Sequence, residues 1–288
     1  MHKSNVNNTS HVYKIKGDCD LTIGNIDFDG SVHISGGVSA GRTIKATGSI
    51  VIAGVAEAAT LIAGGDVEMK SGMQGAGKGK IRAGGSVTAL YIERGHVVAD
   101  GSITLDASIH SVLEAETNII AKGRRGAIIG GKAFAAGYIA ANYLGAVSNT
   151  KTEIAVGLMK NRRDRIKDLE KDIETISDEL IKLNQLKTYL EKAKEKIKPE
   201  RWHKLHEFGE QTKWSCMENL EDCKAECEKL KYELDKTADS KVHVRSAAFA
   251  GSHISIGLAT YKISNEISFT TFKYRNGKIA FFPYELHP

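Results

Sequence analysis

Proline and glycine are both scarce in the most highly charged part of the chain. The 288 residues include only three prolines, and only one of the 29 glycines, Gly209, lies within residues 158–240. Glycine suits turns and is costly inside helices. The step in composition therefore indicates a change of architecture near residue 158.

Several classes of protein are excluded by what the sequence lacks. The four cysteines do not form the disulfide framework of a small secreted domain. No run approaches about 18 apolar residues, and the first residues lack the apolar core of a signal peptide, so we expect a cytoplasmic protein with no membrane span. The net charge of +5 is mild and spread, which disfavours nucleic acid as a partner.

A repeat of 16–20 residues runs through the glycine-rich part. Its template is an apolar residue, any residue, alanine, any residue, glycine, any residue and a second apolar residue, with Thr117 once in the place of glycine. The copies begin at Ile44, Leu61, Ile81, Val97, Leu113 and Ala133. Between copies, apolar residues alternate with period two, which indicates short strands with one buried face. The alanines are expected to point inward.

These features predict a mainly β fold with an α insertion. After an N-terminal tail over residues 1–20, we expect a single-stranded β-solenoid, or β-helix, over residues 21–157. A right-handed coil is expected. Residues 241–288 return to period-two strands and hold many aromatic residues. We expect them to complete and cap the solenoid.

Residues 158–240 are predicted to form a long antiparallel coiled-coil hairpin. Apolar residues recur there at alternating steps of three and four, and Pro199 separates two arms of similar length. Trp202, Leu205 and Phe208 open the second arm. The candidate seam residues are Ile166, Leu169, Ile173, Ile176, Leu180, Leu183, Leu220, Cys223, Cys227, Leu230 and Leu234.

Two of the longer repeats carry basic insertions, which are expected to project as loops. The candidate interaction residues in and beside them are Lys78, Lys80, Arg82, Lys122, Arg124, Arg125 and Lys132. Residues 72–78 also have the spacing of a phosphate loop. However, position 79 is glycine instead of serine or threonine, and no helix pattern follows, so nucleotide hydrolysis is not expected. Binding of a polyanion or nucleic acid by these loops is kept as an alternative.

The strongest enzymatic alternative is a hexapeptide-repeat acyltransferase, a β-helix enzyme that uses a histidine base. His33, His96 and His110 lie within the repeats, but steps of 16, 17 and 20 residues break the hexapeptide rule. His203 and His206 lie about 30 Å of helix away from Cys223 and Cys227, so one metal ion would not take both pairs. We expect no catalytic residue, no cofactor and no metal site.

The ordered set of motifs resembles the C-terminal half of the flagellar assembly protein A (FapA) family of bacterial proteins. It comprises GNIDFDGSV (24–32), the alanine–glycine repeats, GAGKGKIRAGGSV (75–87), KGRRGAIIGG (122–131), TKTEIAVG (150–157) and the charged helical segment. A looser resemblance is to the bactofilins, which are polymer-forming β-helix scaffolds. Members of the FapA family usually carry a sizeable N-terminal domain before this region, so the sequence is either a short member or a fragment.

The resemblance implies a non-enzymatic role in flagellar assembly or polar organisation through protein contacts. From the residues, we expect an interaction scaffold that displays its basic loops and its helical arm to protein partners. The long seam is also the expected surface for forming a homo-oligomer, because two helices leave apolar flanks partly uncovered.

Overall fold

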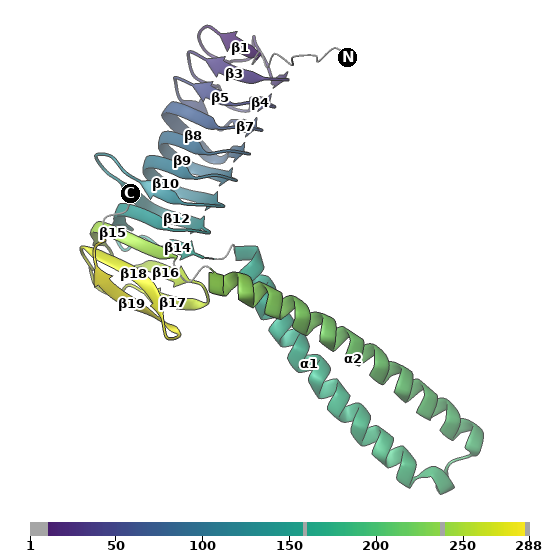
Figure 1. Cartoon of the computed structure of the whole chain (residues 1–288). Coiled ribbons are helices and arrows are strands. Elements are labelled where there is room, and N and C mark those ends of the chain that lie inside the picture. Colours follow the sequence, from purple (N-terminus) through teal and green to yellow (C-terminus); the bar gives the residue numbers. More distant parts are fainter. Residues whose placement is uncertain (1–10, 158–159, 237–239, 286–288) are drawn as a thin grey trace, which may run out of the picture. The chain divides into compact units, whose positions relative to one another are not determined.

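The computed structural model describes residues 11–157, 160–236 and 240–285. The chain divides into two units, one from residues 1–159 and 237–288 and the other from residues 160–236. The first unit is built from strands and the second from helices (Figure 1).

The first unit is a coil of parallel strands that stack along one axis (Figure 1). Its strands before the helices are β1 (Val12–Ile15), β2 (Ile26–Phe28), β3 (Ser31–Ile34), β4 (Thr43–Ala46), β5 (Ile50–Ile52), β6 (Ala56–Glu57), β7 (Thr60–Ala63), β8 (Val67–Ala83), β9 (Val87–Ala99), β10 (Ile103–Ala115), β11 (Ile119–Ala121), β12 (Ala127–Ala135), β13 (Ile139–Leu144) and β14 (Thr152–Val156).

Each turn of the coil contributes to three faces. In β9, residues 87–89 lie on the first face, residues 91–93 on the second and residues 95–99 on the third. Each segment pairs in parallel with the matching segments of β8 and β10. The described residues thereby form the β-solenoid that the repeat predicts, and the solenoid has about 8 turns.

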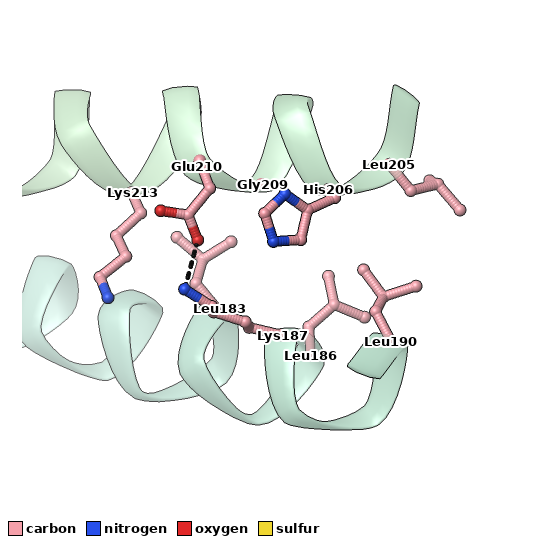
Figure 2. Close-up of a pocket in the computed structure, with 9 residues that line it drawn as sticks. All are labelled: Leu183, Leu186, Lys187, Leu190, Leu205, His206, Gly209, Glu210 and Lys213. Atoms are coloured by element: carbon pink, nitrogen blue, oxygen red, sulfur yellow. Dashed lines mark ion pairs between the residues drawn. The ribbon is translucent and has the colours of Figure 1, made fainter. Parts of the chain in front are cut away.

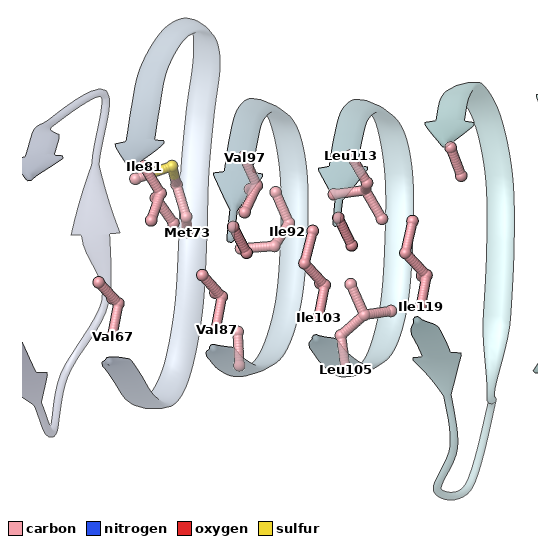
Figure 3. Close-up of a cluster of buried hydrophobic side chains, with 14 of the residues drawn as sticks. Val67, Met73, Ile81, Val87, Ile92, Val97, Ile103, Leu105, Leu113 and Ile119 are labelled. Atoms are coloured by element: carbon pink, nitrogen blue, oxygen red, sulfur yellow. The ribbon is translucent and has the colours of Figure 1, made fainter. Parts of the chain in front are cut away.

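Inward side chains of successive turns stack on one another and fill the core. On the third face, one ladder of residues is at most 2% exposed, namely Ile44, Leu61, Ile81, Val97 and Leu113. Figure 3 shows such side chains pointing into the interior of the coil. Full burial of an aliphatic side chain of this size contributes about 1.5–3 kcal/mol.

The template alanines form a second buried ladder two residues further on. Its members are at most 6% exposed: Ala46, Ala63, Ala83, Ala99, Ala115 and Ala135. Each sits just before the chain turns from the third face to the first. Only a small inward side chain fits there, which confirms the inward position expected for the alanines.

Glycine at the fifth place of the template is explained by close approach between turns. A Cβ atom built on Gly85 would lie 2.1 Å from Asp66 Oδ1, and one on Gly101 would lie 2.5 Å from Ser86 Oγ. These side-chain oxygens accept hydrogen bonds from backbone amides of the next turn, including Ser86 N at 2.7 Å and Ser102 N at 3.1 Å. The repeat therefore encodes a corner that is held by polar contacts.

The second unit consists of α1 (Lys160–Lys192), the short 3₁₀ helix η1 (Lys194–Lys196) and α2 (Pro199–Lys236). Proline suits the first turn of α2 because its missing amide hydrogen would have no partner within the helix. Two ion pairs join the N-terminal part of α1 to the C-terminal part of α2. Arg165, near the start of α1, contacts Glu226 at 2.6 Å, and Lys231, near the end of α2, contacts Glu170 at 2.7 Å.

After α2 the chain continues with β15 (Lys241–Ala248), β16 (Ser252–Ile256), β17 (Ala259–Lys262), β18 (Thr270–Arg275) and β19 (Lys278–Pro283). β15 and β16 pair in parallel with β13 and β14. The pairings of β16 with β17, of β15 with β18 and of β18 with β19 are antiparallel. This change of direction ends the parallel stack.

The predicted N-terminal tail over residues 1–20 is too long. β1 pairs with β3 from Val12 onward, and Cys19 forms a parallel bridge with Val38. The alternating pattern of this first turn is weak, because Tyr13 is 43% exposed although it stands opposite Val32. The predictions for residues 1–10 lie outside the described part of the chain.

Candidate functional site

The connection between the second and third faces is a corner with a left-handed backbone. Arg94 and His110 occupy it in adjacent turns, with φ of 45° and 49°, and Gly130 follows in the next turn with φ of 66°. We call this connection the Arg94 corner. Of the seven described non-glycine residues with positive φ, five lie here: Ala58, Ala76, Arg94, His110 and Asn149.

A left-handed conformation costs about 1–3 kcal/mol for a side chain other than glycine, and such residues cluster at functional sites. Three other turns place glycine at this corner, as at Gly41, Gly130 and Gly251. Arg94 and His110 instead place exposed cationic or titratable side chains there. The corner is therefore a candidate binding surface.

The first basic insertion lies at the same corner. The pairing of β8 with β9 passes from Gln74 opposite Glu93 to Gly79 opposite Gly95, so residues 75–78 bulge out against Arg94 alone. Strand geometry continues on both sides of this bulge. Lys78 is exposed within it. Lys78, Arg94 and His110 thus lie in three successive turns, whose strands are about 4.8 Å apart.

No ion pair within the described residues involves Lys78, Lys80 or Arg94. Two cations in adjacent turns of the Arg94 corner, Lys78 and Arg94, are therefore available to an external partner. The sequence predictions for the interaction loops include Lys78 but omit Arg94, and they consider His110 only as a histidine of the enzymatic alternative. Aligning the repeats would have placed both residues in register with Gly130, which is the signal that was available.

Arg82, beside the first insertion, and Lys132, at the end of the second insertion, lie on the outer side of the third face. Arg82 contacts Asp100 at 2.9 Å, and Lys132 contacts Glu153 at 3.0 Å. Burial raises the pKa of Glu153, but hydrogen bonds from Lys132 and Lys151 outweigh it, so that this pKa lies below its ordinary value. Arg82 and Lys132 are thus engaged within the protein.

The second basic insertion lies at a different corner, between the first and second faces. Lys122, Arg124 and Arg125 are exposed there, between β11 and β12. Asp106 Oδ1 accepts hydrogen bonds from the backbone amides of Arg125 and Gly126, at 2.8 and 2.9 Å. Because the two insertions occupy different corners, they do not form one continuous basic stripe.

The three histidines of the enzymatic alternative do not converge. His33 lies on the first face, His96 lies on the third face with its Nε2 atom 3.4 Å from Glu114 Oε1, and His110 lies at the Arg94 corner. Residues 72–78 lack the context of a phosphate loop, because β8 continues as a strand to Ala83.

Among the described residues, no group of three or more histidine, cysteine, aspartate or glutamate side chains is placed to hold a metal ion. The described helices also include none that is long and apolar enough to cross a membrane.

The predicted seam residues vary in burial along the helices. Ile166 and Leu169 are fully buried and Cys227 is 4% exposed. Ile173, Ile176, Leu180, Leu183, Leu220, Cys223 and Leu230 are half-buried. The side chain of Leu234 lies outside the described residues. Near the start of α2, Trp202 is half-buried and its Nε1 donates to the Leu190 carbonyl at 3.0 Å, whereas Leu205 and Phe208 are 41% and 69% exposed.

Taken together, the stacked faces define the chain as a parallel β-solenoid protein with a two-helix insertion. The family model for the Flagellar Assembly Protein A (FapA) beta solenoid domain matches residues 11–279. The chain belongs to this family, as its motifs predict. No curated protein and no solved structure matches the chain.

Proposed function

We propose that the chain is a non-enzymatic scaffold that acts in bacterial flagellar assembly or polar organisation, in the cytoplasm, by binding protein partners. Membership of the FapA family supports the flagellar assignment. The core of the solenoid is filled by the stacked side chains, so its outer surface is what the fold offers to a partner. The proposed contact surface of the solenoid is the Arg94 corner.

We also propose that α1 and α2 form an antiparallel coiled coil. The ion pairs between Arg165 and Glu226 and between Glu170 and Lys231 support this orientation, since each joins the first turns of α1 to the last turns of α2. The buried side chains of Ile166, Leu169 and Cys227 support a shared seam. The right-handed coil of the solenoid stays a prediction.

The observation that carries the proposed function is the exposure of large apolar side chains on the helices. Tyr189 is 65% exposed, Phe208 is 69% exposed and Trp214 is 75% exposed. Exposed aromatic side chains of this kind are typical of protein-binding surfaces. A helix pair that served only to stabilise the chain would have no need of them.

A comparative pull-down tests this function. The bait would be the intact chain or a variant in which a short glycine–serine linker replaces residues 160–236. We expect flagellar or polar proteins to bind the intact chain and to be lost with the variant. A β-rich circular dichroism spectrum of the variant would show that the solenoid is still folded. An identical set of bound proteins for both baits would contradict the function proposed for the helices.

Self-association through the helix pair is the second role that we propose. Trp214 and Met217 expose 75% and 45% of their surface and are one helical turn apart on α2. Light scattering on the intact chain and on the linker variant measures the effect. If the mass per particle remains the same multiple of the chain mass, the helices do not mediate oligomerisation.

A further inference from the structure

A groove opens between α1 and α2 around Gly209. Figure 2 shows leucine side chains of α1 pointing toward α2 across this gap. Its apolar lining comes from Leu183, Leu186 and Leu190 of α1 and from Leu205 of α2. An ion pair of 2.8 Å between Lys187 and Glu210 crosses it. We call it the Gly209 groove.

The groove lies where the interface residues of α2 change from apolar side chains to glycine and polar side chains. A Cβ atom built on Gly209 would meet nothing within 4 Å, so the helices leave space beside it. The neighbouring interface positions of α2 hold half-buried polar side chains, His206 and Lys213. Leu186 and Leu205 therefore remain 49% and 41% exposed beside the gap.

Leu186 and Leu205, the exposed apolar residues beside the Gly209 groove, lie on one flank of the helix pair. Leu205 directly precedes His206 of the interface, as Glu226 precedes the buried Cys227. Because these positions differ by whole heptads, Leu205 and Glu226 lie on the same side of α2. Leu186 and Arg165 are likewise three heptads apart on α1. The ion pair between Arg165 and Glu226 shows that these two sides meet on one flank.

The same flank holds a second groove of opposite chemistry. Arg165 and Glu226 line it together with three further carboxylates, Asp172, Glu179 and Asp222. Arg165 is already engaged by Glu226, and the other three carboxylates form no ion pair within the described residues. We call this surface the acidic groove.

The two grooves together span a distance that a single short helix could cover. From Asp172 to Leu190 there are 18 residues of α1, which at about 1.5 Å per residue correspond to roughly 27 Å. One helix of about five turns would cover both. Phe208 and Tyr189, exposed by 69% and 65%, extend the apolar half of the flank.

We propose that this flank binds an amphipathic helix of a partner protein, with apolar side chains packed on Leu186 and Leu205 over the Gly209 groove and basic side chains at the acidic groove. This inference rests on the proposed scaffold function. A helix laid in a groove is recognised by its apolar anchors, and complementary charge sets its direction.

The charges argue against a second copy of the chain in parallel alignment. That arrangement would bring Asp172, Glu179 and Asp222 against their own copies and would desolvate negative charge without a cation opposite it. Antiparallel alignment would instead place these carboxylates beside the Gly209 groove, whose lining includes Lys187 and Lys213. A second copy in antiparallel alignment is therefore an outcome that the test has to distinguish.

Binding can be measured with a designed probe and the full-length chain. The probe is a fluorescent helical peptide of about five turns with leucine along one face and lysine flanking its second half. A matched peptide carries glutamate in place of each lysine. We expect saturable binding of the lysine peptide that weakens with salt, and at least about tenfold weaker binding of the glutamate peptide.

The decisive variant is Gly209→Leu, which fills the groove from within the interface. It removes glycine from a helix interior and adds apolar contact, so α1 and α2 should become more protected against hydrogen exchange. The lysine peptide should nevertheless bind at least about tenfold more weakly, which unfolding could not explain.

Several results would overturn the inference. Absence of saturable binding would do so, as would equal affinity for the two peptides or unchanged affinity after Gly209→Leu. A dimer of the intact chain that Phe208→Glu converts to a monomer would show that a second copy covers this flank. If partners that require the helices still bind the Gly209→Leu chain, the scaffold function stands and this surface assignment fails.

Discussion

The His110 imidazole occupies the space that a side chain at position 130 would need. A Cβ atom built on Gly130 would lie 2.4 Å from His110 Nδ1, and Gly130 itself has φ of 66°. The left-handed stack at the Arg94 corner is therefore sterically coupled, because the residue of one turn dictates what the next turn tolerates.

Gly130→Ala should destabilise the solenoid by about 1–3 kcal/mol, since it adds both backbone strain and a collision with His110. The free energy of unfolding, followed through the β signal in chemical denaturation, checks this. Gly41→Ala is the matched control, because Gly41 has φ of 76° but open space around its Cβ position. A loss at Gly130 no larger than that at Gly41 would mean that His110 does not restrict the site.

Ala99→Leu should cost about 1–3 kcal/mol through overpacking. Ala99 is 1% exposed and stands in register between Ala83 and Ala115, so the added atoms would enter a filled ladder. The midpoint of thermal unfolding measures the effect. Val98→Leu, on the outer side of the same strand, should change the midpoint little. Equal effects at both positions would contradict the tight alanine ladder.

The substitutions Gly209→Ala and Gly277→Ala should have opposite effects on local stability. Both positions have open space where a Cβ atom would lie, but only Gly277 has a positive φ, of 82°. Gly209→Ala should stabilise α2 by about 1 kcal/mol through helix propensity. Gly277→Ala should destabilise the β18–β19 turn, where Asn276 and Gly277 both have positive φ as in a type I′ hairpin. Hydrogen exchange of the flanking amides measures the direction of each change in stability. A change in the same direction at both positions would contradict the assigned roles of the two glycines.

Asp106→Ala should loosen the second basic insertion. Its Oδ1 accepts the amides of Arg125 and Gly126, and a hydrogen bond at such an exposed or half-buried place contributes about 0.5–1.5 kcal/mol. Amide exchange at residues 125 and 126 should accelerate by roughly tenfold or more. Asp106→Asn keeps an acceptor oxygen and should preserve slow exchange. Similar acceleration in both variants would show that charge, and not the hydrogen bond, holds this corner.

Acid should weaken the pairing of α1 with α2. The hydrogen bond from Arg165 lowers the pKa of Glu226, and the hydrogen bond from Lys187 lowers the pKa of Glu210. A carboxyl group whose pKa is lower in the folded than in the unfolded state stabilises the folded state at pH values above its unfolded pKa, which is about 4.3 for glutamate. This contribution is lost as the pH falls through the folded value. The helical signal at 222 nm, melted at several pH values, checks this.

The matched variant for the acid effect is Glu226→Gln, which removes one of the two titrations. Its helical melting should depend less steeply on pH below the ordinary glutamate range than that of the unchanged chain. Because both carboxylates are exposed, high salt should reduce the difference between the two proteins. A pH dependence that the substitution leaves unaltered would place the acid sensitivity elsewhere.

The repeat alone determined the coil, because its information is local and periodic. Ala46, Ala63 and Ala83 recur at the spacing of one turn, and each requires the same small inward site as the last. The helical segment could equally be predicted from the sequence, since Ile166 and Leu169 begin a pattern with the period of a helix seam. The end of the predicted tail was missed because the exposed Tyr13 interrupts the apolar alternation of β1.

Only the tertiary structure decided where the basic insertions lie and which charges are engaged. The count of residues between repeats does not reveal the corner at which an extra residue is accommodated, because any corner can bulge. Lys78 therefore joins Arg94 and His110, whereas Arg124 lies at another corner. Similarly, the apolar Leu205 looked like part of the second helical arm's buried pattern. Packing instead turned His206 and Gly209 toward α1, because helix register is set by the sum of contacts along both helices.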